Sequence, residues 1–160
     1  MQTFLPYPDF QESARALDNK RLGKQRVEAW QILRTISAGE SAKGWRNHPA
    51  VNMWRGNEIA LCAYGIAMCN EWIMRGFNDN LKGEFVEMML NYEPITDWSQ
   101  PVGVEDIQNQ YAPSWLGDER IHLSHQSNLI RKDYEYYKLK FPNAPEGLAY
   151  FWITKEKINA

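Results

Sequence analysis

The sequence predicts an all-α protein, a single compact helical domain over residues 1–160 with a long irregular loop near residues 93–117. Three observations support this prediction. Apolar residues recur at helical spacing in several segments, no segment is convincing as a strand, and no repeat or linker divides the chain. A chain of 160 residues can also bury a core without help from disulfides.

The N-terminal part is expected to hold an extended segment followed by a helix. Residues 1–8 (MQTFLPYP) contain two prolines, which disfavour helix in the residues before them. A helix is predicted over residues 11–37, because Leu22, Ala29 and Leu33 share one stripe of a helical wheel. That stripe is the expected core face.

The next predicted helix is the central one. Residues 47–49 (Asn-His-Pro) are typical of a helix start, and an apolar helix is expected from there to about residue 75, with Gly76 as its stop. It is apolar nearly all round, so we expect it to be buried. Its Cys62 and Cys69 are too far apart for a disulfide, about 10 Å along a helix, and indicate the buried thiols of a cytoplasmic protein.

The rest of the chain is predicted to alternate helices with irregular segments. A helix over residues 81–92 precedes the stretch 93–117, which holds three prolines and no clear period. A helix that opens at Asp118 is expected to reach about residue 132, and an extension through residue 137 is left open. The aromatic tail, residues 141–152, is expected to pack back on the body.

Composition limits the class of protein. Hydrophobic residues make up 44% of the chain, and no stretch is long and apolar enough to span a membrane. The net charge of −2 argues weakly against nucleic acid as a partner. Residues 1–48, however, carry eight Lys and Arg against five Asp and Glu, so this basic part can still bind phosphates. Seven Trp and eight Tyr supply rings for a core or for stacking on bases.

The first predicted helix carries the most informative polar pattern. Arg21, Lys24 and Glu28 share a stripe away from the core face. Periodicity alone favours a solvated face with a Lys24–Glu28 pair one turn apart. The functional alternative is a carboxylate set among cations beside a phosphate-binding surface.

Two other segments concentrate polar side chains. Residues 45–49 (WRNHP) stand at the start of the central helix, where a phosphate contact and plain capping are equally reasonable. Residues 122–132 crowd two histidines, an asparagine and two cations onto one short helix. Because no Cys or carboxylate completes a ligand set there, we expect a polar face that meets substrate or phosphate rather than a metal.

These motifs together resemble a known family. The segments MQTFLPYP (1–8), LDNKRLGKQRVE (17–28), GWRNHP (44–49) and HLSHQSNLIRKDYEYY (122–137) are similar to the pyrimidine-dimer DNA glycosylase/endonuclease V family. The closest resemblance is to its bacterial and phage branch, which carries an N-terminal proline motif and an R-N-H-P element. The order and spacing of the segments make the resemblance specific, and it spans most of the chain.

The resemblance implies a compact all-α fold and DNA repair at cyclobutane pyrimidine dimers in duplex DNA. In the family, a free α-amine attacks the sugar C1′ and displaces the base, and a Schiff base then leads to β-elimination, the AP lyase step. An α-amine suits this role because α-amines titrate at lower pH than lysine. Here Gln2 follows Met1, and aminopeptidases generally spare Met before a large residue, so the expected nucleophile is the amine of Met1.

The family's essential glutamate is carried to Glu28. It lies in a segment of the form leucine-x-x-x-x-leucine-x-x-x-x-x-glutamate, which Leu17, Leu22 and Glu28 match without a gap. A carboxylate there can stabilise positive charge at C1′ and shuttle protons. Arg21 stands where the family has a histidine and Val27 where it has an arginine, a loss for which Arg26 or Lys24 would compensate.

The expected partner is damaged double-stranded DNA, bound by a cytoplasmic monomer that needs no membrane, metal or organic cofactor. The cations are expected to contact phosphates, and Trp45 and His48 to support the distorted strand. The full set of predicted DNA contacts is Arg21, Lys24, Arg26, Trp45, Arg46, Asn47, His48, His122, His125, Asn128, Arg131 and Lys132.

Three alternatives stay open at this point. The acidic net charge, Val27 and a retained Met1 favour a non-catalytic relative that binds DNA or a nucleotide. A helical protein-interaction module is a second alternative, which strong salt dependence of DNA binding would contradict. A third is a glycosylase for another modified base, since the sequence does not distinguish lesions.

Overall fold

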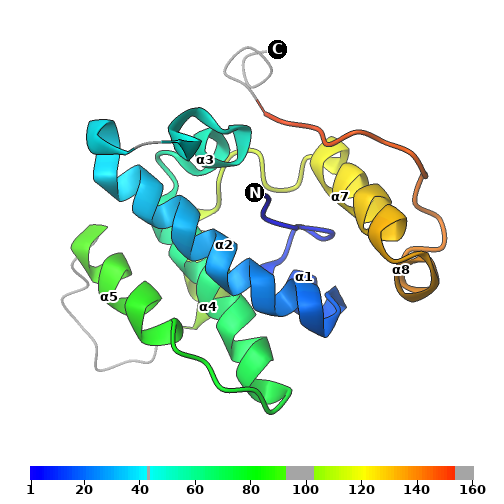
Figure 1. Ribbon diagram of the computed structural model, residues 1–160, viewed down its shortest axis with the longest axis horizontal. Helices are drawn as coiled ribbons and strands as arrows, with labels where there is room; N and C mark the ends of the chain where they lie inside the picture. Colours follow the sequence, from blue (N-terminus) through cyan, green and yellow to red (C-terminus); the bar gives the residue numbers. More distant parts are fainter. Residues whose placement is uncertain (43, 93–102, 154–160) are drawn as a thin grey trace.

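The computed structural model describes residues 1–42, 44–92 and 103–153, and this part of the chain contains helices and no strand (Figure 1). The all-α prediction is therefore confirmed. None of the helices described is both long enough and apolar enough to cross a membrane. The α-helices are α1 (Phe10–Ala16), α2 (Asn19–Ala38), α3 (Pro49–Trp54), α4 (Glu58–Met74), α5 (Lys82–Tyr92), α6 (Val104–Tyr111), α7 (Glu119–Lys132) and α8 (Tyr134–Lys140), with short 3-10 turns η1 (Gly39–Ser41) and η2 (Trp45–Asn47).

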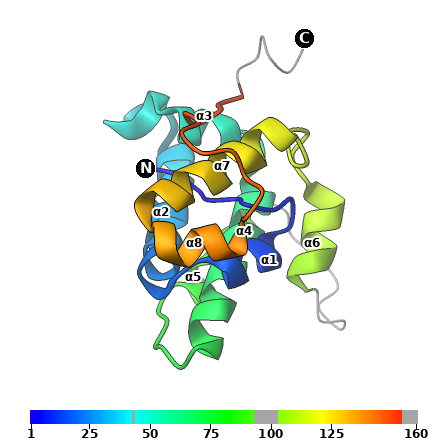
Figure 2. The same ribbon diagram turned by 90° about the vertical axis from the view of Figure 1, so that its right-hand side faces the viewer.

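Helix α4 is the centre of the packing, as the sequence predicted. Every residue from 60 to 69 is buried, and α1, α2, α5 and α6 all contact this helix (Figures 1 and 2). A Cβ at Gly65 would lie 2.4 Å from the ring of Phe85, so the glycine allows α5 to pack closely. Cys62 and Cys69 are buried free thiols, also as expected.

The helix predicted over residues 11–37 is in fact two helices, α1 and α2. The chain is extended at Leu17 and Asp18, where Leu17 is fully buried. Arg21 Nη1 donates to the Asp18 carboxylate over 3.2 Å, and the hydroxyl of Tyr137 donates to the same carboxylate. This contact with α8, 119 residues away in sequence, overrides local helix propensity.

The helix predicted over residues 49–75 is also broken. Helix α3 ends at Trp54 and α4 begins at Glu58, because Gly56 adopts a φ of 87°, which a helix cannot accommodate. Gly76, with a φ of 93°, stops α4 where the sequence predicted.

The C-terminal half differs from expectation in two places. Helix α5 is confirmed, but residues 104–111, which fall in the predicted irregular loop, form α6, and residues 93–102 of that loop lie outside the described part. Helix α7 ends at Lys132, and Asp133 caps a separate α8 by accepting from the Tyr136 amide over 3.3 Å. The extension through residue 137 is therefore a second helix.

The tail packs back on the body, as predicted. Its residues 141–153 form no helix or strand and run along α7 (Figure 1). The amide of Leu148 donates to Ser127 Oγ over 3.0 Å, and that of Phe151 donates to Ser124 Oγ over 3.1 Å. Polar side chains of α7 thus satisfy the backbone of the tail.

Candidate active site

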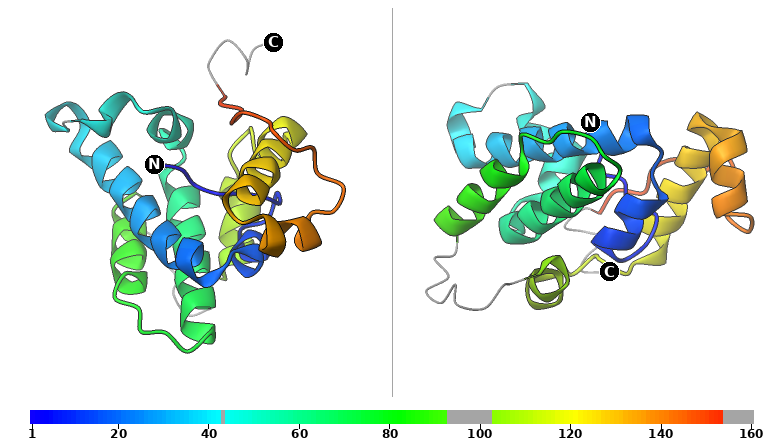
Figure 3. Two further views of the ribbon diagram at one scale, coloured as in Figure 1. Left: turned by 45° about the vertical axis from the view of Figure 1, so that its right-hand side comes forward. Right: turned by 90° about the horizontal axis from the view of Figure 1, so that it is seen from below.

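The N-terminal segment, defined as residues 1–9, has no regular structure, yet much of it is buried. Residues 2–5 are at most 7% exposed. The segment enters between α2 and α7 and passes through the middle of the molecule before α1 begins (Figure 3). Chain ends usually fray, so this burial requires specific partners for the backbone groups of the segment.

On one side, α2 and α4 supply these partners. Gln25 Nε2 donates to the carbonyl of Gln2 over 3.0 Å, and its Oε1 accepts from the amide of Phe4 over 2.9 Å. The hydroxyl of Tyr64 lies 2.6 Å from Gln25 Oε1 and 2.8 Å from the carbonyl oxygen of Phe4. Burial raises the pKa of Tyr64 well above its usual range, so the hydroxyl stays a donor.

On the other side, two histidines of α7 hold Leu5. The amide of Leu5 donates to His125 Nδ1 over 2.9 Å, while His122 Nδ1 donates to the carbonyl of Leu5 over 2.8 Å. His122 Nε2 accepts from the amide of Gly117 over 2.9 Å. Burial lowers the pKa of His125 to about 3 and also lowers that of His122, so both rings are neutral near pH 7.

Three residues of α7 that were predicted to contact DNA are buried in the structure. His122, His125 and Asn128 are 5%, 1% and 1% exposed, and Asn128 Nδ2 donates to the carbonyl of Leu148 over 3.0 Å. Their side chains hold the N-terminal segment and the tail inside the protein. A buried irregular backbone needs the same kinds of polar residues as a ligand does, so the sequence pattern alone does not distinguish the two roles.

The N-terminal segment ends beside Glu28. The amide of Gln2 donates to Glu28 Oε2 over 3.3 Å, and Gln25 Nε2 donates to the same oxygen over 3.1 Å. Lys24 Nζ lies 3.7 Å from Glu28 Oε1, so the pair expected from a solvated face is also present. The carboxylate of Glu28 therefore binds the residue that directly follows Met1, the residue that carries the N-terminal amine. The Glu28 side chain is only 13% exposed.

Met1 and Glu28 line a cleft of about 370 Å³. Its charged rim carries four cations against the one carboxylate, and these cations belong to α2 and to the end of α7. Such a cleft attracts phosphates. We call it the amine cleft; its described lining residues are Met1, Gln2, Phe4, Lys20, Arg21, Lys24, Gln25, Glu28, Lys132 and Tyr150.

Five of the described lining residues were not predicted as site residues from the sequence: Gln2, Phe4, Lys20, Gln25 and Tyr150. Lys20 lies one helical turn before Lys24, so the wheel that grouped Lys24 with Glu28 could have included it. Tyr150 reaches the cleft from the tail, more than 120 residues from Glu28, and no local pattern indicates this. Lys132 was predicted, and its pKa is lowered by burial and by the positive charges of Arg21 and Lys24.

Arg26, which was also predicted to contact DNA, does not line the amine cleft. Its guanidinium forms an ion pair with Asp79 whose two side chains are 11% and 2% exposed, and it lies 4.7 Å above the ring of Trp72. This buried contact joins α2 to α4 and to the segment before α5. Arg21 and Lys24 remain at the cleft, whereas Val27 is 42% exposed on the neighbouring surface of α2.

The segment around η2 lies near the N-terminal amine. His48 Nδ1 accepts a hydrogen bond from the amide of Ala50 over 3.0 Å, so this side chain caps α3. Burial and then the charge of the N-terminal amine lower the pKa of His48, while Glu28 raises it. Trp45 is 55% exposed with its ring edge-on to His48, Arg46 is half-buried and Asn47 is exposed.

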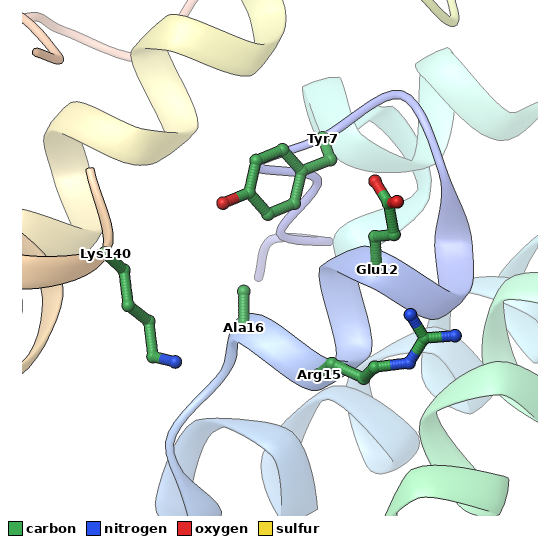
Figure 4. Close-up of a pocket in the computed structure, with 5 residues that line it drawn as sticks. All are labelled: Tyr7, Glu12, Arg15, Ala16 and Lys140. Atoms are coloured by element: carbon green, nitrogen blue, oxygen red, sulfur yellow. The ribbon is translucent and has the colours of Figure 1, made fainter.

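A second hollow, of about 470 Å³, lies between α1 and α8 (Figure 4). It is wide open, and the charged ends of Arg15 and Lys140 point in different directions in the figure. Side chains that do not converge cannot hold one ligand firmly. In the amine cleft, charged side chains and a fixed backbone converge, so it is the better candidate for the active site.

The amine cleft defines a class of protein, helical and suited to an anionic, phosphate-bearing ligand. Residues 1–84 of the 160 match the model of a family described as pyrimidine dimer DNA glycosylase, so the chain belongs to that family. This confirms the resemblance found in the sequence, and it supports a DNA glycosylase class of enzyme with DNA as substrate. No curated protein and no solved structure matches the chain.

The matched span contains one side of the amine cleft and not the other. It includes the N-terminal segment, α2 with Glu28, and α4. Helix α7, helix α8 and the tail lie beyond it. Lys132 and Tyr150 are therefore cleft residues about which the family match carries no information.

Proposed function

We propose that the protein is a DNA N-glycosylase with AP lyase activity that excises damaged pyrimidines from duplex DNA, cyclobutane dimers among them. The observation that carries this proposal is the hydrogen bond from the amide of Gln2 to Glu28, which places the chain's first amine beside a carboxylate in a cationic cleft. Membership of the family supports the choice of substrate.

In the proposed reaction, the neutral amine of Met1 attacks C1′ of the damaged nucleotide. The C1′–N1 bond breaks, the base leaves with a proton, and the sugar ring opens to a Schiff base between C1′ and the amine. Loss of a proton from C2′ then breaks the C3′–O3′ bond, and water releases the sugar fragment from the amine. No metal or redox step is needed for this balance.

Glu28 has two roles in this scheme. Its charge stabilises the cation that develops at C1′ when the base leaves, and its free lone pairs can carry the proton removed from C2′. Gln25 acts as a positioning residue, because its amide nitrogen holds both the carbonyl of Gln2 and the carboxylate of Glu28. Lys20, Arg21, Lys24 and Lys132 are proposed to bind the flanking phosphates.

Other residues that the sequence predicted as DNA contacts lie outside the amine cleft, and we propose for them a secondary role in DNA binding. Trp45, Arg46, Asn47 and His48 lie around η2 on the side of the N-terminal amine, where they would meet the DNA strand beyond the cleft. Arg131 is exposed at the end of α7 and donates to Asn128 Oδ1 over 2.6 Å.

The test is borohydride trapping of the untagged protein on two duplex oligonucleotides, one with an abasic site and one with a thymine dimer. We expect a covalent adduct on both, mapped by mass spectrometry to the first residue. Glu28→Gln should lose the adduct by a factor of about 100 or more while DNA binding is kept. Glu87→Gln, an exposed carboxylate on α5, is the matched control and should trap as well as wild type.

Three other outcomes would contradict the proposal in different ways. Salt-sensitive binding without an adduct on either duplex would indicate the non-catalytic relative. An adduct on the abasic duplex alone would leave AP lyase activity and exclude the dimer as substrate. An adduct that maps to Lys132 would replace Met1 as the nucleophile.

A further inference from the structure

Asp18 stands at the N-cap position of α2, yet its side chain does not cap that helix. Asp9, Asp118 and Asp133 stand at the same position before α1, α7 and α8, and the side chain of each accepts a hydrogen bond from an amide of the first turn. Capping is the ordinary role of an aspartate at this position. The carboxylate of Asp18 therefore serves another purpose.

This carboxylate binds the guanidinium of Arg21. Arg21 Nη1 donates to Asp18 Oδ1 over 3.2 Å and to Asp18 Oδ2 over 3.3 Å, and the side chains of Arg21 and Asp18 are 19% and 15% exposed. Arg21 Nη2 donates to the carbonyl of Lys132 over 3.4 Å. The guanidinium thus bridges α2 and the last residue of α7, the two helices that carry the cations of the amine cleft.

Tyr137 of α8 fixes Asp18 in turn. Its hydroxyl donates to the Asp18 carboxylate and accepts from the Asp18 amide over 2.9 Å. Tyr137 is fully buried, and burial raises the pKa of its hydroxyl, which therefore stays a donor. Burial acts to raise the pKa of Asp18, but the hydrogen bonds from Tyr137 and Arg21 outweigh it and lower that pKa, so the carboxylate is charged near pH 7.

Asp18 holds Arg21 without taking part in the surface of the cleft. Arg21 is among the described lining residues of the amine cleft and Asp18 is not. A guanidinium has five N–H groups in a rigid fork, so the contacts of Nη1 and Nη2 leave others for a phosphate. A fork that is fixed before binding loses little entropy when a phosphate binds to it.

We propose that Asp18 is a positioning residue, which orients the guanidinium of Arg21 toward a phosphate of the DNA beside the Met1 amine. This inference rests on the proposed function. The negative charge of Asp18 repels phosphates, so Asp18 contributes orientation and not affinity. Through the bond from Arg21 to the Lys132 carbonyl, the same contact fixes the end of α7 against α2.

The test measures two quantities for Asp18→Asn. The first is the single-turnover rate constant of borohydride trapping at saturating abasic duplex, which should fall about 10- to 100-fold, the order of loss expected when a group is misplaced by about 1 Å. The second is the affinity for undamaged duplex, which should stay at the wild-type value or rise, because a negative charge near the cleft is removed. A merely structural role of Asp18 would not separate rate from affinity.

A double-mutant cycle tests whether Asp18 acts through Arg21. Arg21→Gln alone should lower the trapping rate constant. Adding Asp18→Asn to it should cause little further loss, because the group that Asp18 orients is already absent. Losses that multiply in the double variant would contradict the proposal.

Asp79→Asn is the matched control. It breaks another ion pair of α2, that with Arg26, which does not line the amine cleft, so its trapping rate constant should stay at the wild-type value even where its Tm falls. If Asp18→Asn does not fold, Asp18→Ser takes its place, because serine is also a favoured N-cap residue. An unchanged rate constant in the Asp18 variant, or an equal fall in Asp79→Asn, would overturn the proposal. A wild-type protein that forms no adduct on the abasic duplex would instead overturn the proposed function.

Discussion

The N-terminal segment and α4 are both buried, and they are held in opposite ways. In α4 the backbone is satisfied within the helix, so its side chains can be almost entirely apolar. The N-terminal segment has no intrahelical hydrogen bonds, and its backbone groups form hydrogen bonds with side chains instead. Those side chains are Gln25, Glu28, Tyr64, Gln108, His122, His125 and Gln126, together with Gln2 and Ser13 of the same part of the chain.

The comparison shows what a buried polar residue indicates in this protein. Gln25, His122 and His125 are among its most buried polar side chains, and each of them contacts the N-terminal segment. They mark the path of the segment, and Gln25 also lines the amine cleft. The stability of α4 should therefore depend on volume, and that of the N-terminal segment on hydrogen bonds and pH.

The largest effect is expected in α4. Leu61→Ala removes a fully buried side chain and should lower the free energy of unfolding by about 2–5 kcal/mol, the cost of a cavity in a packed core. Denaturant unfolding at pH 7 measures this. Trapping activity per folded molecule should stay at the wild-type value, and a loss of activity without a loss of stability would contradict the separation of core and site.

The next effect is expected at Gln25. Gln25→Leu leaves the Phe4 amide and the Gln2 carbonyl without partners, at a cost of about 1–3 kcal/mol for each group left unsatisfied. Unlike Leu61→Ala, it should also slow trapping in molecules that are still folded, because the amine is no longer fixed beside Glu28. Gln31→Leu, an exposed position on the same helix, is the control. Wild-type trapping in the Gln25 variant would show that the N-terminal segment is held by other contacts.

Acid should destabilise the N-terminal segment selectively. The folded pKa of His125, about 3, lies below its ordinary value of 6.5, so the unfolded chain binds more protons between these values. Stability is fully present above pH 6.5 and is lost as the pH falls, by about 1.4 kcal/mol per pH unit for this histidine. Burial lowers the pKa of His122 too, which adds to the loss.

Unfolding curves at pH 7, 6 and 5 measure this slope, above the range in which carboxylates titrate. Hydrogen exchange locates it, since the amide of Leu5, bonded to His125, should lose protection before the amides of α4. His125→Asn should flatten the slope strongly, and His48→Gln should flatten it less, because the pKa of the half-buried His48 is also lowered. Equal loss of protection in both regions would mean that acid acts on the whole fold.

The smallest effect is expected for Lys24→Gln. The Lys24–Glu28 pair spans 3.7 Å with Lys24 70% exposed, so removing it should change the unfolding free energy by no more than about 0.5 kcal/mol. The amide of Gln2 and Gln25 Nε2 still hold Glu28 in the variant. A larger change in stability would show that the lysine, and not the N-terminal segment, holds the carboxylate.

The sequence predicts the regular parts of this fold better than their interruptions. The apolar run of α4 and the glycine that stops it are local signals, and both predictions hold. The breaks at Asp18 and Gly56 were missed for different reasons. One depends on Tyr137 from α8, and the other on a glycine that looked compatible with a helix until its φ was known.

The candidate site divides in a similar way. Glu28, Arg21, Lys24 and Lys132 were predicted as site residues and line the amine cleft. Arg26, one residue from exposed Val27, turns inward to Asp79 instead, which a wheel cannot show because the partner lies 53 residues away. Tyr150 comes from a tail without periodicity, so only its tertiary contacts reveal it.

The way in which the N-terminal segment is fixed also determines when the site can exist during synthesis. Leu5 is among the first residues made, yet its partner His125 follows 120 residues later. At about 5–20 residues per second, the ribosome needs about 6–24 s to supply that histidine. Until then the N-terminal segment lacks the α7 side chains that hold it inside the protein, and Tyr150, which lines the amine cleft, has not been made. Under the proposed mechanism, the amine cleft is therefore complete only when both the N-terminal segment and the tail have packed against α7.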